Sequence, residues 1–196
     1  MYNSSTGRRT GPDLSSVLTL KGIIMASAPK SKVVTGKVRF SYAHVFQPSA
    51  SIEGGTPKYS VSIIIPKSDT ETVTKLKKAF DDVKTNASAF FGGAVPKGLK
   101  GGLRDGDEEK DDEAYAGSYF INANSAQKPG LVDADMNAII DPSEFYSGCF
   151  GRASLTFYAY NSNGSKGIAC GLNNLQKLED GEKLGGGTTA ASDFAV

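Results

Sequence analysis

The chain has 196 residues, of which 39% are hydrophobic, and its 23 glycines and 8 prolines favour strands joined by turns over a bundle of helices. That length suits one domain with a single core and tails. The net charge of +1 excludes neither a nucleic acid nor a protein as partner, whereas the lack of an apolar run near the roughly 20 residues of a membrane span argues against a membrane-embedded chain.

The charges are unevenly distributed along the sequence. Residues 1–40 hold seven Lys/Arg against one Asp, and residues 41–104 hold nine against five acids. The run DGDEEKDDE at 105–113 holds seven acids and one Lys, and residues 114–196 hold eight acids against five Lys/Arg. A basic first half beside an acidic insert is compatible with a polyanion partner, and equally with ordinary surface variation.

Residues 1–30 are expected to form a disordered N-terminal extension. Arg8 and Arg9 followed by the apolar stretch VLTLKGIIMA imitate a secretion signal. Lys21 interrupts that stretch, which argues against export. We favour Met25 as the original start, with residues 1–24 as a leader or extension.

Two strands are predicted next. In VVTGKVRFSYAHVF, residues 33–46, the alternation places Val38, Phe40 and Tyr42 on the core face and polar residues on the other. In KYSVSIIIP, residues 58–66, Tyr59, Val61, Ile63 and Ile65 share one face, and Pro66 ends the strand. The two strands are expected to pair as an antiparallel hairpin.

An amphipathic helix is predicted from residue 68 to residue 91. Its apolar stripe recurs at spacings of three and four: Val73, Leu76, Phe80, Val83, Ala87 and Phe90. Ser68 and Glu71 have the spacing of a capping box, and Gly92 and Gly93 supply a stop. We expect the stripe to cover the core and not to hold a cofactor.

The rest of the chain predicts further strands and a tail. Residues 92–114 are glycine-rich and then acidic, which indicates a long loop. Strands are expected within 114–125, 128–140, 146–161 and 166–178, and residues 179–196 have the composition of a flexible tail. The fold class is therefore mainly β: an OB-fold-like, five-stranded antiparallel barrel over 31–178, with one amphipathic helix and flexible ends.

The stretch RASLTFYAYN, residues 152–161, separates into two faces when it is read as a strand. Leu155 and Phe157 point to the core, while Arg152, Tyr158 and Tyr160 point outward. Outward tyrosines can stack on bases irrespective of sequence, for roughly 1–3 kcal/mol per base, while nearby cations hold the phosphates. The candidate DNA-binding residues are Lys37, Arg39, Tyr119, Lys128, Arg152, Tyr158, Tyr160 and Lys166.

Catalytic chemistry has little support in this sequence. His44 is the single histidine, and a structural or partly buried role is favoured over that of a general base. No phosphate-binding glycine motif occurs, and DGDEEKDDE lacks the spacing of a calcium loop. Cys149 and Cys170 suggest free thiols in a reducing compartment, with a disulfide between them as the alternative. We expect no enzyme, no metal and no cofactor.

Several segments resemble a family of phage-encoded single-stranded-DNA-binding proteins, over about residues 31–196. They are KVRFSYAHVFQP, YSVSIIIPKSD, DGDEEKDDE, YAGSYFINANS, KPGLVDADMNAIID, EFYSGCFGRASLTFYAYN and KGIACGLNNLQKLEDGEKLGGG. The resemblance implies an OB-fold, sequence-independent binding of single-stranded DNA, and a role in phage replication or recombination in the cytoplasm of the infected host cell. Asp193 and Phe194 resemble the acidic, phenylalanine-containing C-termini that recruit replication or recombination enzymes; a simple solvated tail is the alternative.

Two other functions stay open at this point. A protein-interaction or virion structural module would use the aromatic face without binding nucleic acid. A metal-dependent nuclease would use Asp107 and Glu108 in the acidic run. Pairing of sheet edges would allow a homodimer.

Overall fold

The structure, a computed structural model, describes residues 27–50, 55–162 and 164–185. Disorder was expected for residues 1–30; residues 1–26 lie outside these ranges, as do the tail residues Asp193 and Phe194, while Lys30 already belongs to a strand. The elements in chain order are β1 (Lys30–Val34), β2 (Val38–Ser49), β3 (Lys58–Pro66), α1 (Thr70–Asn86), β4 (Arg104–Asp105), α2 (Gly106–Glu109), the 3-10 turn η2 (Glu113–Tyr115), β5 (Ser118–Ser125), β6 (Gly130–Val132), β7 (Phe150–Ser162) and β8 (Ser165–Glu179).

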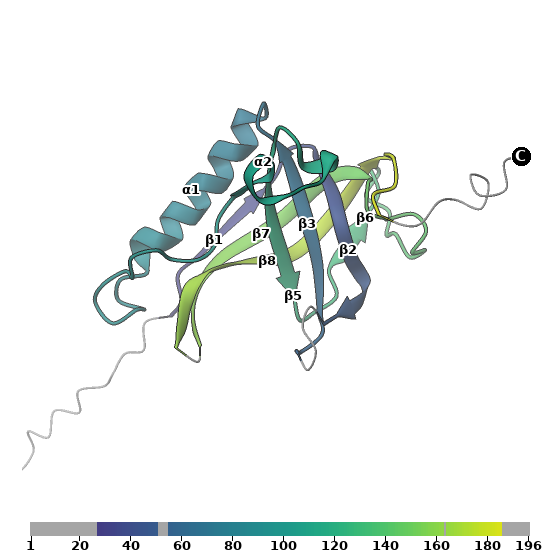
Figure 1. Ribbon diagram of the computed structural model, residues 1–196. Coiled ribbons are helices and arrows are strands. Elements are labelled where there is room, and N and C mark those ends of the chain that lie inside the picture. The colour runs from purple at the N-terminus through teal and green to yellow at the C-terminus, as the bar shows by residue number, and fades with distance from the viewer. Residues whose placement is uncertain (1–26, 51–54, 163, 186–196) are drawn as a thin grey trace, which may run out of the picture.

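Five strands close into a ring, in which β2 pairs with β3, β3 with β5, β5 with β8, β8 with β7, and β7 again with β2. All of these pairs are antiparallel except β5 with β8, which is parallel. This closed ring confirms the predicted OB-fold-like, five-stranded barrel. The prediction that all of its strands are antiparallel is wrong for β5 and β8. In Figure 1, β2, β3 and β5 form the near wall, and the long β7–β8 hairpin crosses behind them and extends beyond β5.

The interior follows the predicted alternation in β7 and in the first half of β2. Phe40, Leu155 and Phe157 are fully buried, and the residues between them along β7 are half-buried or exposed. Tyr42 was predicted on the core face, and this prediction is wrong, because 57% of its surface is exposed. Its φ of +46° and the shift in β2–β3 register between Ser41 and His44 mark a bulge, which reverses the facing of the strand.

Helix α1 packs against β1 and β7 (Figure 1), with its stripe inward as predicted, and Phe80 meets Phe157 edge-on at 6.2 Å between ring centroids. Its N-terminus differs from the predicted capping box. Asp69 is the N-cap, and its carboxylate accepts a hydrogen bond of 3.0 Å from the N–H of Thr72. The helix ends at Asn86, before the two glycines, and residues 87–92 continue as turns.

The predicted loop at 92–114 has more structure than its composition indicated. β4 pairs with β5, and Tyr115 in η2 is fully buried against Phe120 and Ile64. The Tyr115 hydroxyl donates to Ser62 Oγ at 3.1 Å. The acidic segment, residues 105–113, is thus fastened at both ends to the barrel.

The chain beyond β8 is also held, although residues 179–196 were predicted as a flexible tail. Glu179 is the last residue of β8, and Leu184 donates its N–H to the Ser147 carbonyl at 2.8 Å. The Tyr146 hydroxyl donates to Asp180 at 2.8 Å. Residues 179–185 are therefore attached to the rest of the domain by hydrogen bonds.

Cys149 and Cys170 are free and buried, as expected for a protein whose thiols stay reduced. Within the described ranges, no helix is long and apolar enough to cross a membrane. The same residues contain no cluster of three or more histidine, cysteine or acidic side chains arranged to hold a metal ion.

Candidate nucleic-acid interface

A hollow of about 620 Å³ lies on the surface formed by β2, β3 and β5. The strand register places Ser60 opposite His44 on one side and opposite Asn124 on the other, so these three side chains share a face. The lining includes Tyr42, His44, Lys58, Lys110, Asn122 and Asn124. An aromatic ring, two lysines and two asparagine amides thus surround one shallow surface.

Lys110 lines this hollow beside Tyr42. Its ammonium lies 5.4 Å from the ring centroid of Tyr42, 5.2 Å from that of Tyr115 and 5.5 Å from that of Phe120. No acidic partner for Lys110 is found among the described residues, although it stands within the acidic run. Cation–π contacts with these rings stabilise its positive charge, which stays available to an anion.

A second hollow, of about 240 Å³, adjoins the first and shares Asn122 and Asn124 with it. Its lining adds Lys100, Arg104 and Tyr160. Together the two hollows form one groove, named so below, which runs from Tyr42 across β5 to Tyr160. Aromatic rings stand at both ends of the groove, with cations beside each.

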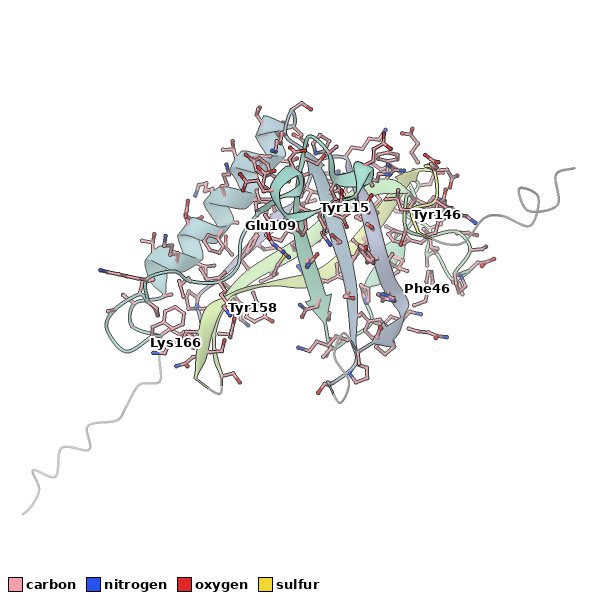
Figure 2. All side chains as sticks on the ribbon, in the orientation of Figure 1. Phe46, Glu109, Tyr115, Tyr146, Tyr158 and Lys166 are labelled. Carbon is pink, nitrogen blue, oxygen red and sulfur yellow. The ribbon has the colours of Figure 1, made fainter. Side chains whose placement is uncertain are left out.

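Tyr160 and Tyr158 share the outward face of β7. Tyr160 is paired with Gly167 on β8, and Tyr158 lies against Gly171, where an added Cβ would be 3.3 Å from the ring. Small residues on β8 therefore leave room for both rings on the sheet. Figure 2 shows Tyr158 on the curved part of the hairpin and Lys166 toward its tip.

Strand β1 brings two further cations beside these rings. Lys30 is paired with Tyr158, and Lys32 with Thr156, so both lysines lie on the outward face. Lys30 and Lys32 are both exposed to solvent.

Lys37 and Arg39, predicted to contact DNA, lie elsewhere. Lys37 forms an ion pair with Glu179, and Arg39 donates to the carbonyls of Gly148 at 3.2 Å and Glu182 at 2.9 Å. Both cations also stand over the ring of Phe150, at 5.3 and 5.4 Å. They fasten the chain that follows β8.

Three more predicted contacts are also outside the groove. Tyr119 is half-buried with Lys67 and Lys77 each 5.1 Å from its ring centroid. Lys128 stands 5.4 Å from the ring centroid of Phe46. Arg152 donates to the Thr35 carbonyl at 3.2 Å and lines a separate hollow between β1 and α1. Of the eight predicted residues, only Tyr160 lines the groove, and Tyr158 and Lys166 lie on the same hairpin.

Residues 31–196 match one protein family, described as "Enterobacter phage Enc34, ssDNA-binding protein". The chain belongs to this family. The match begins and ends at the residues where the sequence resemblance did, and it confirms that resemblance.

Members of the Enc34 family and other phage proteins share the fold. The structure is similar to the single-stranded DNA-binding protein from bacteriophage Enc34 in complex with ssDNA, with a TM-score of 0.66 and 26% identity over 79% of this chain and 90% of that one. It is also similar in fold to gp2.5, a single-stranded DNA-binding protein encoded by bacteriophage T7, with a TM-score of 0.58 and 15% identity over 85% of this chain and 95% of that one. Protein p50 of Acyrthosiphon pisum secondary endosymbiont phage 1 is 28% identical over 171 residues, covering 83% of this chain and 92% of the relative.

Sequence reasoning missed several groove residues of this Enc34-family chain. Tyr42 was assigned to the core because a bulge cannot be read from alternation, and His44 is exposed in the groove instead of partly buried. Lys110 could have been found, since a single Lys within seven acids is an exception that calls for a reason.

The acidic segment is partly neutralised where it meets the barrel. Lys67 lies 2.7 Å from both Asp105 and Asp107. These hydrogen-bonded pairs, that with Asp105 first, raise the pKa of Lys67. The pKa of Asp107 is lowered, first by Lys67 and then by the N–H of Gly117. The other five acidic residues of the segment are exposed, and one of them, Glu109, pairs with Arg104.

Proposed function

We propose that this chain binds single-stranded DNA without reading its sequence, and that it coats and protects the strand during phage replication or recombination in the cytoplasm of the host cell. The observation that supports this most is the groove, which has a tyrosine at each end and cations beside both. Membership of the Enc34 family and the likeness to a relative solved in complex with ssDNA point the same way.

Bases stack on the rings of Tyr42 and Tyr160, and Tyr158 extends the row along the hairpin. Each stacked base contributes roughly 1–3 kcal/mol irrespective of its identity, because every base has a π-face. Phosphates lie against Lys58, Lys100 and Lys110, which line the groove. Bound in this way, a strand is unpaired and covered, and no base edge needs to be read.

Partners beyond DNA belong to the same proposal. The tail residues Asp193 and Phe194 would recruit replication or recombination enzymes, and open sheet edges would allow a homodimer. Both can be tested separately from DNA binding, by removing residues 186–196 and by measuring the mass in solution.

Fluorescence anisotropy with labelled oligo-dT tests the central claim. The Tyr42→Ala/Tyr160→Ala double variant should bind at least about tenfold more weakly, since each lost stacking contact is worth roughly 1–3 kcal/mol. The matched control is Tyr119→Ala, which removes a tyrosine outside the groove and should keep the wild-type affinity. Thermal melting of each variant checks that the fold is intact.

The salt dependence of binding, the binding of oligo-dT by the wild-type protein and a test for cleavage distinguish this function from the two alternatives. Log affinity should fall with log salt by roughly 0.7 per phosphate neutralised on a single strand. If the wild-type protein leaves oligo-dT unbound, a protein-interaction or virion module is the better reading. Cleavage that requires magnesium and disappears in Asp107→Ala/Glu108→Ala would instead support the nuclease.

A further inference from the structure

Arg104 enters the groove already paired with a carboxylate. Its Nε and Nη2 donate to the same oxygen, Glu109 Oε2, at 2.8 and 2.5 Å. Both side chains are partly open to solvent, with 45% of Arg104 and 40% of Glu109 exposed. In the free protein, Glu109 is thus already ion-paired with Arg104, a cation that lines the groove together with Tyr160.

The guanidinium of Arg104 is held by a second contact that does not involve Glu109. Its central carbon lies 4.6 Å from the ring centroid of Phe120, which is fully buried. β4 also fixes the backbone, because Arg104 is paired with Phe120 across the strands. If Glu109 turned away, Arg104 would stay in place with its donors directed outward.

Glu109 has the freedom to turn away. It is the last residue of the four-residue α2, and its backbone is anchored by the contacts of Lys67 with Asp105 and Asp107 at the start of that helix. A rotation of one exposed side chain is therefore sufficient, and the segment need not leave the barrel.

We propose that Glu109 is an internal competitor for the phosphate that Arg104 binds. A carboxylate oxygen receives both guanidinium hydrogen bonds in the free protein, and a phosphate of the entering strand replaces it. Binding at this position is an exchange of one anion for another. This exchange adds less to the affinity for DNA than an unpaired arginine would. It also leaves the Glu109 carboxylate near the bound strand. This inference rests on the proposed function and adds a restraint on its strength.

The experiment compares Glu109→Gln with Glu108→Gln. Each variant removes one negative charge from adjacent positions of the same short helix, and only Glu109 pairs with Arg104. Oligo-dT affinity is measured by anisotropy at several salt concentrations. Glu109→Gln should bind about two- to fivefold more tightly than Glu108→Gln at low salt, the scale of an exposed ion pair, and its salt slope should steepen by up to about 0.7.

A double-mutant cycle with Arg104→Gln isolates the pair. In the Arg104→Gln background, adding Glu109→Gln should change affinity no more than Glu108→Gln does, because the competed cation is gone. Equal effects of the two glutamine substitutions in the wild-type background would overturn the inference and indicate long-range charge alone. That result leaves the proposed function standing if the tyrosine double variant still loses affinity. No binding of oligo-dT by the wild-type protein would overturn both.

Discussion

The ring of Tyr160 lies against Gly167, its directly paired residue on β8. A Cβ added at Gly167 would stand 2.7 Å from both Cε1 and the hydroxyl oxygen of Tyr160. Real Cβ atoms do not approach other atoms so closely, so the ring would have to move. Because Gly167 has no side chain, the Tyr160 ring can lie in this position at one end of the groove.

Gly167→Ala should therefore displace the Tyr160 ring and weaken binding of oligo-dT by up to about tenfold, near the lower part of the range for one stacked base. The barrel should keep its melting temperature, because the atoms in the way belong to the far end of a flexible side chain. Anisotropy and thermal melting measure the two quantities. In a Tyr160→Ala background, the same substitution should have little further effect on affinity; a full additional loss would contradict the assignment.

Alternation in the sequence predicted the parts of the barrel in which strands run regularly. In β7 the predicted core residues Leu155 and Phe157 are buried, and Tyr158 and Tyr160 face outward. A side-chain period of two survives as long as the backbone stays extended. The ring of five strands and the helix followed from the same patterns.

The site was harder to predict, because it depends on places where the pattern breaks. The bulge at Tyr42 turns a predicted core ring outward, and its φ of +46° leaves no mark in the residue types. Lys37 and Arg39 do face outward as predicted, but Lys37 is ion-paired with Glu179 and Arg39 donates to the backbone carbonyl of Glu182. Sequence distance hides such contacts, since the two residues of the Lys37–Glu179 pair lie 142 positions apart.

The start of α1 gives a stability prediction that separates two caps. Asp69→Ala should lower the stability of the fold by about 1 kcal/mol, because the Thr72 N–H would lose the carboxylate that caps the helix. Ser68→Ala removes the residue that the sequence pattern favoured, and it should change stability by less than about 0.5 kcal/mol. Urea unfolding followed by circular dichroism measures both. A larger loss for Ser68→Ala would restore the capping box.

The two cysteines should be unreactive in the folded protein. Burial raises the pKa of the Cys170 thiol to about 12, and burial also raises the pKa of Cys149. The attacking thiolate is therefore scarce at pH 8, and neither sulfur is accessible. A chromogenic disulfide reagent should modify both thiols rapidly in denaturant and neither of them in native buffer within minutes. Rapid reaction of the native protein would show that one of the sites opens.

The attachment of the acidic segment should weaken in acid. Asp107 accepts hydrogen bonds from Lys67 at 2.7 Å and from the Gly117 N–H at 2.8 Å. Both contacts lower the pKa of Asp107, so the folded carboxyl stays ionised below its usual range. Stability from this group is present above about pH 3.9, the value in an unfolded chain, and is lost as the pH falls through the lowered pKa.

Hydrogen exchange at the Gly117 amide tests this prediction directly. Protection of that amide, corrected for the intrinsic rate at each pH, should fall as the pH drops below about 3.9. The Ile168 amide donates to the backbone carbonyl of Lys100 at 3.0 Å, so its protection should stay constant while the barrel remains folded. In Asp107→Asn the amide oxygen can still accept from Gly117 but cannot titrate, and the pH dependence at Gly117 should disappear. If the Asn variant keeps the wild-type pH profile, another group controls the attachment.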